Sequence, residues 1–299
     1  MSDTIIRAHQ LKLLDIMKLF HELCVRHRLT YYLLGGTMLG AVRHQGFIPW
    51  DDDIDVGMPR GDYEKLLALP QSEWAGHLHL KTPHNATDLI LPYSKLMDRR
   101  TTLVEDYSDG LVGGVYIDVF PLDGAGNSMA SARLIYRCYY WERTLLHMNQ
   151  NKKPLKDNLF RRLLRAYARL YRPRSIYRRV ERIMTFHSYE KSRYIGNFGG
   201  VWKFKEFMPK DYFGEPTLYA FEGSKFWGVE NADAYLTALY GDYMTLPPVD
   251  ARQSHHNIKH MDLDSPYSDY PGCVESAGKG VDGEHERRSP GHAVKKEPA

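Results

Sequence analysis

The apolar positions near the start of the chain repeat at helical spacing. Between residues 4 and 28 they gather on one side, which predicts a long amphipathic helix with one buried face. The apolar residues of this face are Leu13, Ile16, Met17, Phe20 and Leu23. Residues 31–34, which follow, form a short apolar run rich in aromatic side chains. A run of this kind is typical of a buried strand.

Two glycines come directly after this strand. Gly35 and Gly36 predict a tight turn, because glycine adopts backbone angles that other residues avoid. Thr37 can cap a short helix that runs to Val42. Residues 45–46, Gln-Gly, are expected to break that helix.

Alternation of polar and apolar positions predicts the sheet that follows. Residues 53–58 alternate strictly, which predicts a half-buried strand with Asp53 and Asp55 on its polar face. A short helix is expected at residues 62–69. Further candidate strands lie at residues 78–81, 91–97 and 115–120. Pro121 is expected to end the last strand, because proline cannot donate to a sheet. The order of these elements predicts a mixed α/β (α+β) fold, with helices flanking the sheet.

The middle of the chain changes to a long, basic and helical pattern at residues 129–190. Within residues 152–182, twelve Lys and Arg side chains face only Asp157 and Glu181 as counter-charges. Leu and Tyr side chains interleave with the basic ones. The pattern predicts either a solvated helical face or a surface for an anionic lipid or an anionic polymer. Nucleic acid is not expected, because the chain contains no recognised binding module.

The last part of the chain differs again in composition. Residues 268–299 are polar, rich in Gly, Pro and charge, and nearly free of large apolar side chains. Such a segment cannot offset its ordering entropy, which predicts a disordered tail. The predicted organisation is therefore one catalytic domain at residues 1–267, with the basic helices at residues 129–190 as an insertion.

Composition narrows the class of protein. At 299 residues, with 43% hydrophobic and 26% charged residues, the chain can bury a full core. Its net charge of +3 does not demand a nucleic-acid partner. Three widely spaced cysteines form no disulfide framework, which favours a reducing cytosol. No signal peptide or bilayer-spanning run is apparent, so we expect a cytoplasmic protein, soluble or peripheral on the inner face of the cytoplasmic membrane.

Four carboxylates crowd into five residues at Asp51, Asp52, Asp53 and Asp55. They repel one another unless a cation lies among them. On a strand, Asp53 and Asp55 share one face and Asp52 points to the other. Two carboxylates on one face form a site for a hard cation, Mg²⁺ or Mn²⁺.

The glycine pair just before these carboxylates suggests the ligand. Around Gly35 and Gly36 the backbone N–H groups can approach an anion closely. A cation beside a backbone cradle of this kind predicts a phosphorylated substrate, and a nucleotide in particular.

Asp118 is the candidate for a third carboxylate. It lies between Ile117 and Val119 in a predicted strand, where a lone charge is costly without a cation or a partner. It can complete the coordination of the cation or take a proton from an attacking hydroxyl. The alternative is an ordinary salt bridge to a neighbouring arginine. Asp123, which follows Pro121, is expected in a loop.

Three cationic side chains are candidates for contact with substrate. Arg43 and His44 lie between the glycines and the aspartates, close enough to reach a phosphate or an acceptor. Lys95 lies in a strand-like segment and can neutralise charge that develops on a phosphate. For each of the three, a surface ion pair is an equally good interpretation.

Aromatic and histidine side chains supply the last candidates. Trp50 and Tyr63 can stack on a base or surround a quaternary ammonium group, although a place in the core is favoured for both. Adjacent histidines on a strand point to opposite faces, so at most one of His255 and His256 can be a ligand. We therefore expect His255 to be a structural or substrate-contacting residue.

One block of the sequence resembles the signature of a known family, the LicD phosphocholine transferases, whose eukaryotic relatives are fukutin and fukutin-related protein. The block reads YYLLGGTMLGAVRHQGFIPWDDDIDVGMPRGDYEKL. Two later segments resemble further motifs of that family, VYIDVFPLDG and LYGDYMTLPPVDARQSHH. The resemblance extends from about residue 10 to residue 260 and excludes the tail.

The resemblance implies a nucleotidyltransferase-like fold and assigns roles to six residues. It implies a nucleotide-phosphate loop at Gly35, Gly36 and Thr37, a metal-binding pair at Asp53 and Asp55, and a third carboxylate at Asp118. Members of the family move phosphocholine from CDP-choline to a sugar hydroxyl of a surface glycan such as teichoic acid, lipopolysaccharide or capsule. Some relatives move ribitol phosphate from CDP-ribitol.

The implied activity is a metal-dependent phosphotransferase that releases CMP. Its partners would be a CDP-alcohol and a glycan acceptor, which can be linked to a lipid at an anionic membrane surface. Nucleotidyl transfer and a non-catalytic scaffold for glycan or lipid are the alternatives.

Overall fold

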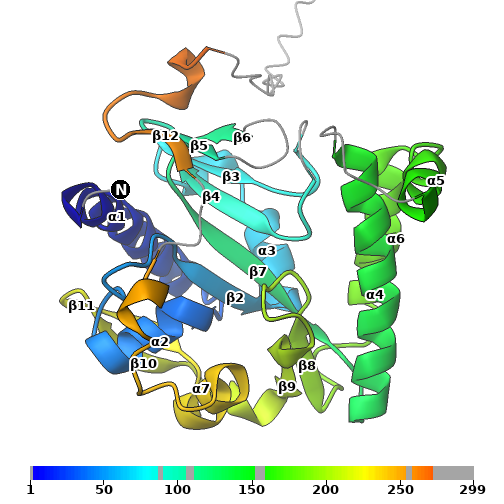
Figure 1. Ribbon diagram of the computed structural model, residues 1–299. Coiled ribbons are helices and arrows are strands. Elements are labelled where there is room, and N and C mark those ends of the chain that lie inside the picture. The colour runs from blue at the N-terminus through cyan, green and yellow to red at the C-terminus, as the bar shows by residue number, and fades with distance from the viewer. Residues whose placement is uncertain (1–2, 87–89, 106–110, 152–158, 254–257, 272–299) are drawn as a thin grey trace, which may run out of the picture.

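The computed structural model describes residues 3–86, 90–105, 111–151, 159–253 and 258–271 (Figure 1). Its helices are α1 (Asp3–His27), α2 (Gly35–His44), α3 (Arg60–Leu67), α4 (Met129–Gln150), α5 (Leu159–Ala168), α6 (Pro173–Met184) and α7 (Ala232–Tyr240). Its strands are β1 (Tyr32–Leu33), β2 (Asp55–Pro59), β3 (Leu78–Lys81), β4 (Ser94–Asp98), β5 (Thr102–Glu105), β6 (Leu111–Gly113), β7 (Tyr116–Gly124), β8 (Tyr194–Asn197), β9 (Phe207–Pro209), β10 (Thr217–Phe221), β11 (Ser224–Gly228) and β12 (Ile258–Asp262).

The central sheet has the order β1-β2-β7-β4-β3, and β8 and β9 extend it from the far end of β7. Strands β2 and β7 run parallel, whereas the other neighbours in the sheet are antiparallel. The remaining strands form two smaller sheets, the β10–β11 hairpin and a sheet of order β12-β5-β6. This mixed sheet with flanking helices confirms the predicted α/β (α+β) fold.

Strand β7 continues through Pro121, so the prediction that this proline ends the strand is wrong. On one side, β4 pairs with β7 only as far as Val119, and β8 begins to pair with it at Leu122. Pro121 therefore occupies the gap between two neighbours, where the missing N–H removes no hydrogen bond from that edge. Because β7 continues past Pro121, the predicted loop position of Asp123 is also wrong. Asp123 lies within β7, is buried, and forms an ion pair with Arg60 of α3.

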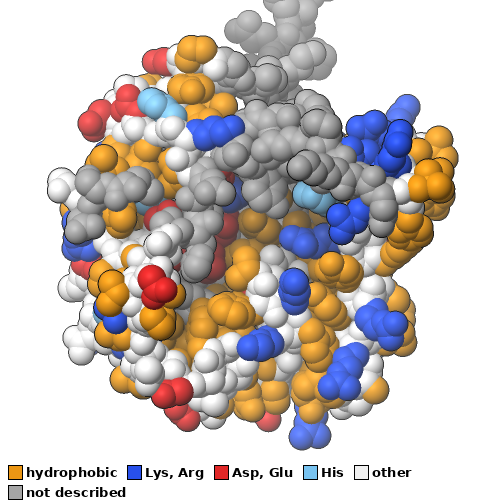
Figure 2. All heavy atoms as spheres, in the orientation of Figure 1, with side chains coloured by type: hydrophobic (Ala, Val, Ile, Leu, Met, Phe, Trp, Pro, Cys, Tyr) orange, Lys and Arg blue, Asp and Glu red, His pale blue; other side chains and the backbone are white. Residues whose placement is uncertain are grey.

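Two hydrophobic cores support this architecture. The larger core joins the sheet to α1, α2, α3 and α7. The second lies between α4, α5 and α6 and the strands β8 and β9. These three helices, called the helical layer below, stand together along one side of the sheet (Figure 1). Figure 2 shows many Lys and Arg side chains over that side of the surface.

Three helices thus occupy much of the segment that the sequence predicts to be basic and helical. Lys152, Lys153, Lys156 and Asp157 lie outside the described residues, as does most of the predicted tail. The division of the chain into residues 1–267 and a tail stays a prediction. Among the helices that the structure describes, none combines the length and apolar character needed to cross a membrane.

Candidate active site

Four charged side chains form a row across four neighbouring strands. Asp55 of β2 lies in register with Asp118 of β7, Asp118 with Lys95 of β4, and Lys95 with Lys81 of β3. Residues in register on adjacent strands project from the same face, with the strands about 5 Å apart. One face of the sheet therefore carries two acidic residues beside two basic ones, which we call the charged row.

Asp118 and Lys95 form the centre of the charged row. The Lys95 Nζ lies 3.0 Å from the Asp118 Oδ1, and both side chains are buried. The same Nζ lies 3.4 Å from the centroid of the Tyr116 ring, a cation–π contact. Burial raises the pKa of Asp118 above its usual range, although Lys95 opposes the shift. The salt-bridge partner of Asp118 is therefore Lys95 rather than an arginine. Lys95, which was predicted to face a phosphate, is held by the Asp118 carboxylate.

The predicted metal pair lies where the chain enters β2. The strand begins at Asp55, and Asp53 lies two residues before it. The Asp118 N–H donates to the Ile54 carbonyl over 2.9 Å, so the backbone between Asp53 and Asp55 is hydrogen-bonded to β7. Burial and the neighbouring carboxylates of Asp53 and Asp118 raise the pKa of Asp55 well above its usual range. Burial is the larger cause of this shift, and repulsion between neighbouring carboxylates adds to it.

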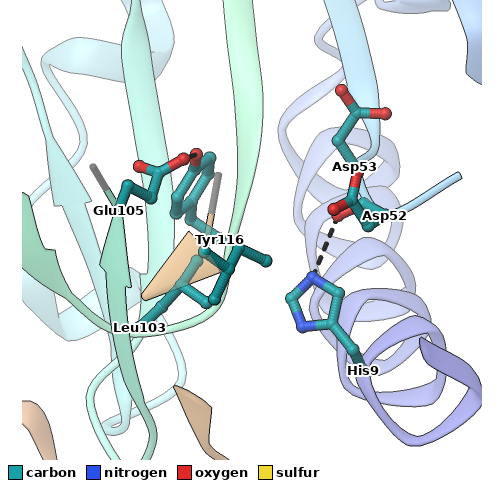
Figure 3. A pocket seen from close by; sticks show the side chains of 7 residues that line it. His9, Asp52, Asp53, Leu103, Glu105 and Tyr116 are labelled. Atoms are coloured by element: carbon teal, nitrogen blue, oxygen red, sulfur yellow. Dashed lines mark hydrogen bonds between the residues drawn. The ribbon is translucent and has the colours of Figure 1, made fainter. Parts of the chain in front are cut away.

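A small pocket adjoins the first of these aspartates (Figure 3). Its lining residues are His9, Asp52, Asp53, Leu103, Glu105, Tyr116 and Ile258. The His9 Nε2 lies 2.9 Å from the Asp52 carbonyl oxygen, and the Tyr116 hydroxyl donates to the Glu105 carboxylate over 2.7 Å. Asp52 precedes the strand, so the strand alternation used to separate it from Asp53 does not apply. Both residues line the same pocket.

Helix α2 begins at Gly35, two residues earlier than Thr37, the predicted cap. Gly35 has φ +50°, a left-handed conformation that suits glycine, and its N–H donates to the Tyr235 hydroxyl over 2.9 Å. The Thr37 hydroxyl does not cap the helix but accepts the Asp55 N–H over 2.9 Å. Thr37 therefore fixes the start of α2 against the start of β2.

Gly36 lies in the first turn of α2, where the N–H groups lack an intrahelical acceptor. A Cβ at this position would come within 2.7 Å of the Asp51 Oδ2, so a larger residue does not fit without movement. The helix N-terminus and the acidic segment therefore meet closely at Gly36. Such a terminus, with its free N–H groups and positive dipole end, is a place where phosphate binds.

The structure does not bring every predicted residue to this site. Arg43 lies eight residues after Gly35, about 12 Å farther along the helix axis, and its Nη1 donates to the Tyr243 carbonyl over 2.7 Å. His44 lies beside it, where burial and Arg43 lower its pKa. Trp50 is half-buried, with the Arg252 guanidinium 5.4 Å from its ring centroid.

Tyr63 and His255 are the two remaining candidates. Tyr63 is buried, and its hydroxyl lies 2.6 Å from the Ser94 Oγ, which confirms the favoured core position. His255 lies outside the described residues.

Two residues near the site were not predicted from the sequence. Glu206 is buried, and burial raises its pKa to about 7, although the Trp202 N–H lowers it. Its charge contributes to the raised pKa of Asp55. Tyr235 of α7 holds the Gly35 amide, as described above. Both come from the aromatic-rich segment after residue 191, whose local pattern carries no sign of contact with residues so distant in sequence.

A hard cation fits the chemistry of the acidic pair. Among the described residues, no three Asp, Glu, His or Cys side chains are grouped as a ready-made metal site. Mg²⁺, however, is usually held by one or two carboxylates, with water and substrate phosphates completing its shell. The pair at Asp53 and Asp55 meets that requirement for a cation that arrives with a diphosphate.

These features together define a mixed α/β protein with an acidic site between a central sheet and a helix N-terminus. The model of one family, described as the nucleotidyltransferase domain of LicD/FKTN/FKRP, matches residues 28–143. The chain is also similar to the lipopolysaccharide cholinephosphotransferase LicD of Haemophilus influenzae, with 32% identity over 263 residues. That alignment covers 84% of this chain and 96% of the Haemophilus protein. The chain therefore belongs to the LicD family, and it is a transferase of phosphorus-containing groups.

Shorter similarities connect the chain to two proteins of Rickettsia. An uncharacterized protein of Rickettsia prowazekii is 47% identical over 68 residues, which cover 22% of this chain and 26% of that protein. An uncharacterized protein of Rickettsia typhi is 43% identical over 83 residues, which cover 27% of this chain and 25% of that protein.

Proposed function

We propose that the protein transfers phosphocholine from CDP-choline to a sugar hydroxyl of a cell-surface glycan and releases CMP. Lipopolysaccharide is the favoured acceptor, because the Haemophilus relative is named as a lipopolysaccharide cholinephosphotransferase and is matched over 96% of its length. The observation that carries the proposal is the register of Asp55 with Asp118 beside the N-terminus of α2. Teichoic acid and capsule remain alternative acceptors.

The acidic residues would hold Mg²⁺ or Mn²⁺, with Asp53 and Asp55 as the pair and Asp118 as the third carboxylate. When bound, the cation supplies positive charge against the diphosphate of the donor. The raised pKa of Asp55 supports this role, because a carboxyl in that setting ionises readily only with positive charge nearby.

The helix N-terminus and Asp118 have separate tasks in the proposed reaction. The N–H groups of Gly36 and Thr37 would bind phosphate oxygens at the first turn of α2. Asp118, fixed by Lys95, would accept the proton of the attacking sugar hydroxyl. The hydroxyl oxygen bonds to the phosphorus that carries choline, and the bond from that phosphorus to the CMP oxygen breaks.

Product analysis tests this proposal. The protein is incubated with lipopolysaccharide and either CDP-choline or CDP-ribitol, with and without Mg²⁺, and released products are identified by mass spectrometry. We expect CMP release and a phosphocholine-modified glycan from CDP-choline, only with the cation. CMP from CDP-ribitol alone would reassign the donor, and free phosphocholine with a nucleotide on the glycan would indicate nucleotidyl transfer. A folded protein that binds neither Mg²⁺ nor CDP-choline in calorimetry would be a scaffold.

A pair of variants tests the metal assignment. Asp53→Asn should abolish turnover while far-ultraviolet circular dichroism and Tm stay unchanged. Asp211→Asn changes an exposed aspartate away from the charged row and should retain full activity. Retained activity in folded Asp53→Asn protein would contradict the assignment.

A further inference from the structure

Helix α5 carries a line of exposed apolar side chains on its outer face. Leu159, Phe160, Leu163 and Tyr167 are 71%, 66%, 61% and 46% exposed. Residues 159, 163 and 167 are spaced four apart and therefore share one face of the helix. We call these four residues the apolar stripe. Leu170, just after the helix, is 78% exposed and extends the patch. Large apolar side chains gathered in this way usually mark a binding surface.

The opposite side of α5 is already attached to the helical layer. Ala168 is buried in the second core, and Leu164 packs against it. The Asn149 Nδ2 of α4 donates to the carbonyls of Ala168 and Tyr171 over 2.7 and 2.9 Å. The apolar stripe is therefore not the face by which α5 packs on its own fold.

The charge around the apolar stripe is strongly positive. Exposed arginines lie on α5, on α6 and in the turn between them: Arg161, Arg162, Arg169, Arg172, Arg174, Arg178 and Arg182. The acidic residues of the three helices are Glu142 and Glu181. Glu142 forms an ion pair with Arg179 over 2.9 Å, and a Glu181 carboxylate oxygen lies 3.1 Å from the His84 Nε2. Figure 2 shows blue and orange side chains side by side over α5.

We infer that α5 docks the protein on the surface of an anionic lipid membrane, with the apolar stripe entering the interface and the arginines contacting lipid phosphates. An interfacial helix combines these two features. At ten residues α5 is about 15 Å long, half the thickness of a bilayer core, so it lies on the membrane. A soluble anionic polymer would pair with the arginines but would leave Phe160 and Leu163 in water. The inference does not rest on the proposed reaction, because α5 contributes nothing to the charged row.

Vesicle binding by the full chain tests the inference. The protein is sedimented with vesicles of phosphatidylcholine alone or of phosphatidylcholine mixed with phosphatidylglycerol. We expect binding to the mixed vesicles only, weakened by salt. Phe160→Gln with Leu163→Gln, and separately Arg162→Gln with Arg169→Gln, should each lower the partition coefficient about tenfold or more.

Matched controls lie on the β10–β11 hairpin. Leu218→Gln removes an apolar side chain that is 53% exposed, and Lys225→Gln removes an exposed positive charge. Both should bind mixed vesicles as the unchanged protein does. Equal binding to both vesicle types, or unchanged binding by the folded α5 variants, would overturn the inference. Binding to soluble heparin without binding to vesicles would also overturn it, in favour of a polymer.

Discussion

The acidic site of the central sheet and the surface of the helical layer each gather charges of one sign, but in opposite surroundings. In the sheet, the half-buried Asp53 and Asp55 lie near the buried Asp118, and the pKa of Asp55 is raised. In the helical layer, the excess arginines project into solvent. A buried charge is costly unless it is paired, whereas an exposed charge costs little. The sheet is therefore the place where removing a charge should change activity and stability, and the helical layer the place where it should change binding to a surface.

Asp55→Asn should give the largest effect. It removes one carboxylate of the proposed pair, and we expect kcat/KM to fall about a thousandfold or more, about 4 kcal/mol of transition-state stabilisation. The free energy of unfolding should not fall, because the substitution also removes repulsion from Asp53 and Asp118. Steady-state CMP release and urea unfolding measure the two quantities. A variant that keeps activity within tenfold would remove Asp55 from the mechanism.

Asp123→Asn should give the largest loss of stability. The Arg60 Nε and Nη2 donate to the two Asp123 oxygens over 2.7 and 2.5 Å, and the Asp123 side chain is 1% exposed. Removing one partner of a buried pair leaves an uncompensated charge, which costs about 3–5 kcal/mol. In the helical layer, Glu142→Gln breaks the more exposed pair with Arg179 and should cost about 1 kcal/mol. Equal losses in urea unfolding would contradict the contrast between the two regions.

Glu206→Gln should change the pH dependence of stability. The pKa of Glu206 is about 7 when folded, against 4.5 as its ordinary value, so the folded state favours the protonated carboxyl. The contribution of protonated Glu206 to the free energy of unfolding is fully present below about pH 4.5 and is lost as the pH rises through about 7. The glutamine side chain cannot ionise. At about pH 8 the free energy of unfolding of the variant should therefore be about 3 kcal/mol higher than that of the unchanged protein. At about pH 4 the two should agree in urea unfolding. A difference independent of pH would show that Glu206 does not titrate in this range.

The sequence predicts those parts of the molecule that depend on neighbouring residues. Helix α1, strand β3 and the acidic pair follow from spacing along one segment, and the structure places the first two where they were expected. The strand through Pro121 and the pairing of Asp123 could not be predicted, because they depend on where β4 stops and β8 begins. Cross-strand register brought Lys95 to Asp118, and no local pattern records it.

The roles of Thr37 and Glu206 show a second limit. Thr37 has a side chain typical of a helix cap, but α2 begins two residues before it, and its hydroxyl accepts the Asp55 N–H instead. Glu206 lies between Lys205 and Phe207, a setting that looks like an ordinary surface turn. Its burial comes from the packing of segments far apart in the sequence. The burial of a charged side chain is therefore difficult to predict from a local sequence pattern.

Leu163→Gln should have the smallest effect on stability. The side chain is 61% exposed, and surface substitutions usually change the free energy of unfolding by less than about 0.5 kcal/mol. Ile176→Val, in the buried core of the same helical layer, should cost about 1 kcal/mol and shows what urea unfolding can resolve. A loss above about 1 kcal/mol in Leu163→Gln would mean that the apolar stripe is covered in solution by protein. In that case the helical layer would resemble the sheet, with its function decided by packing rather than by an exposed surface.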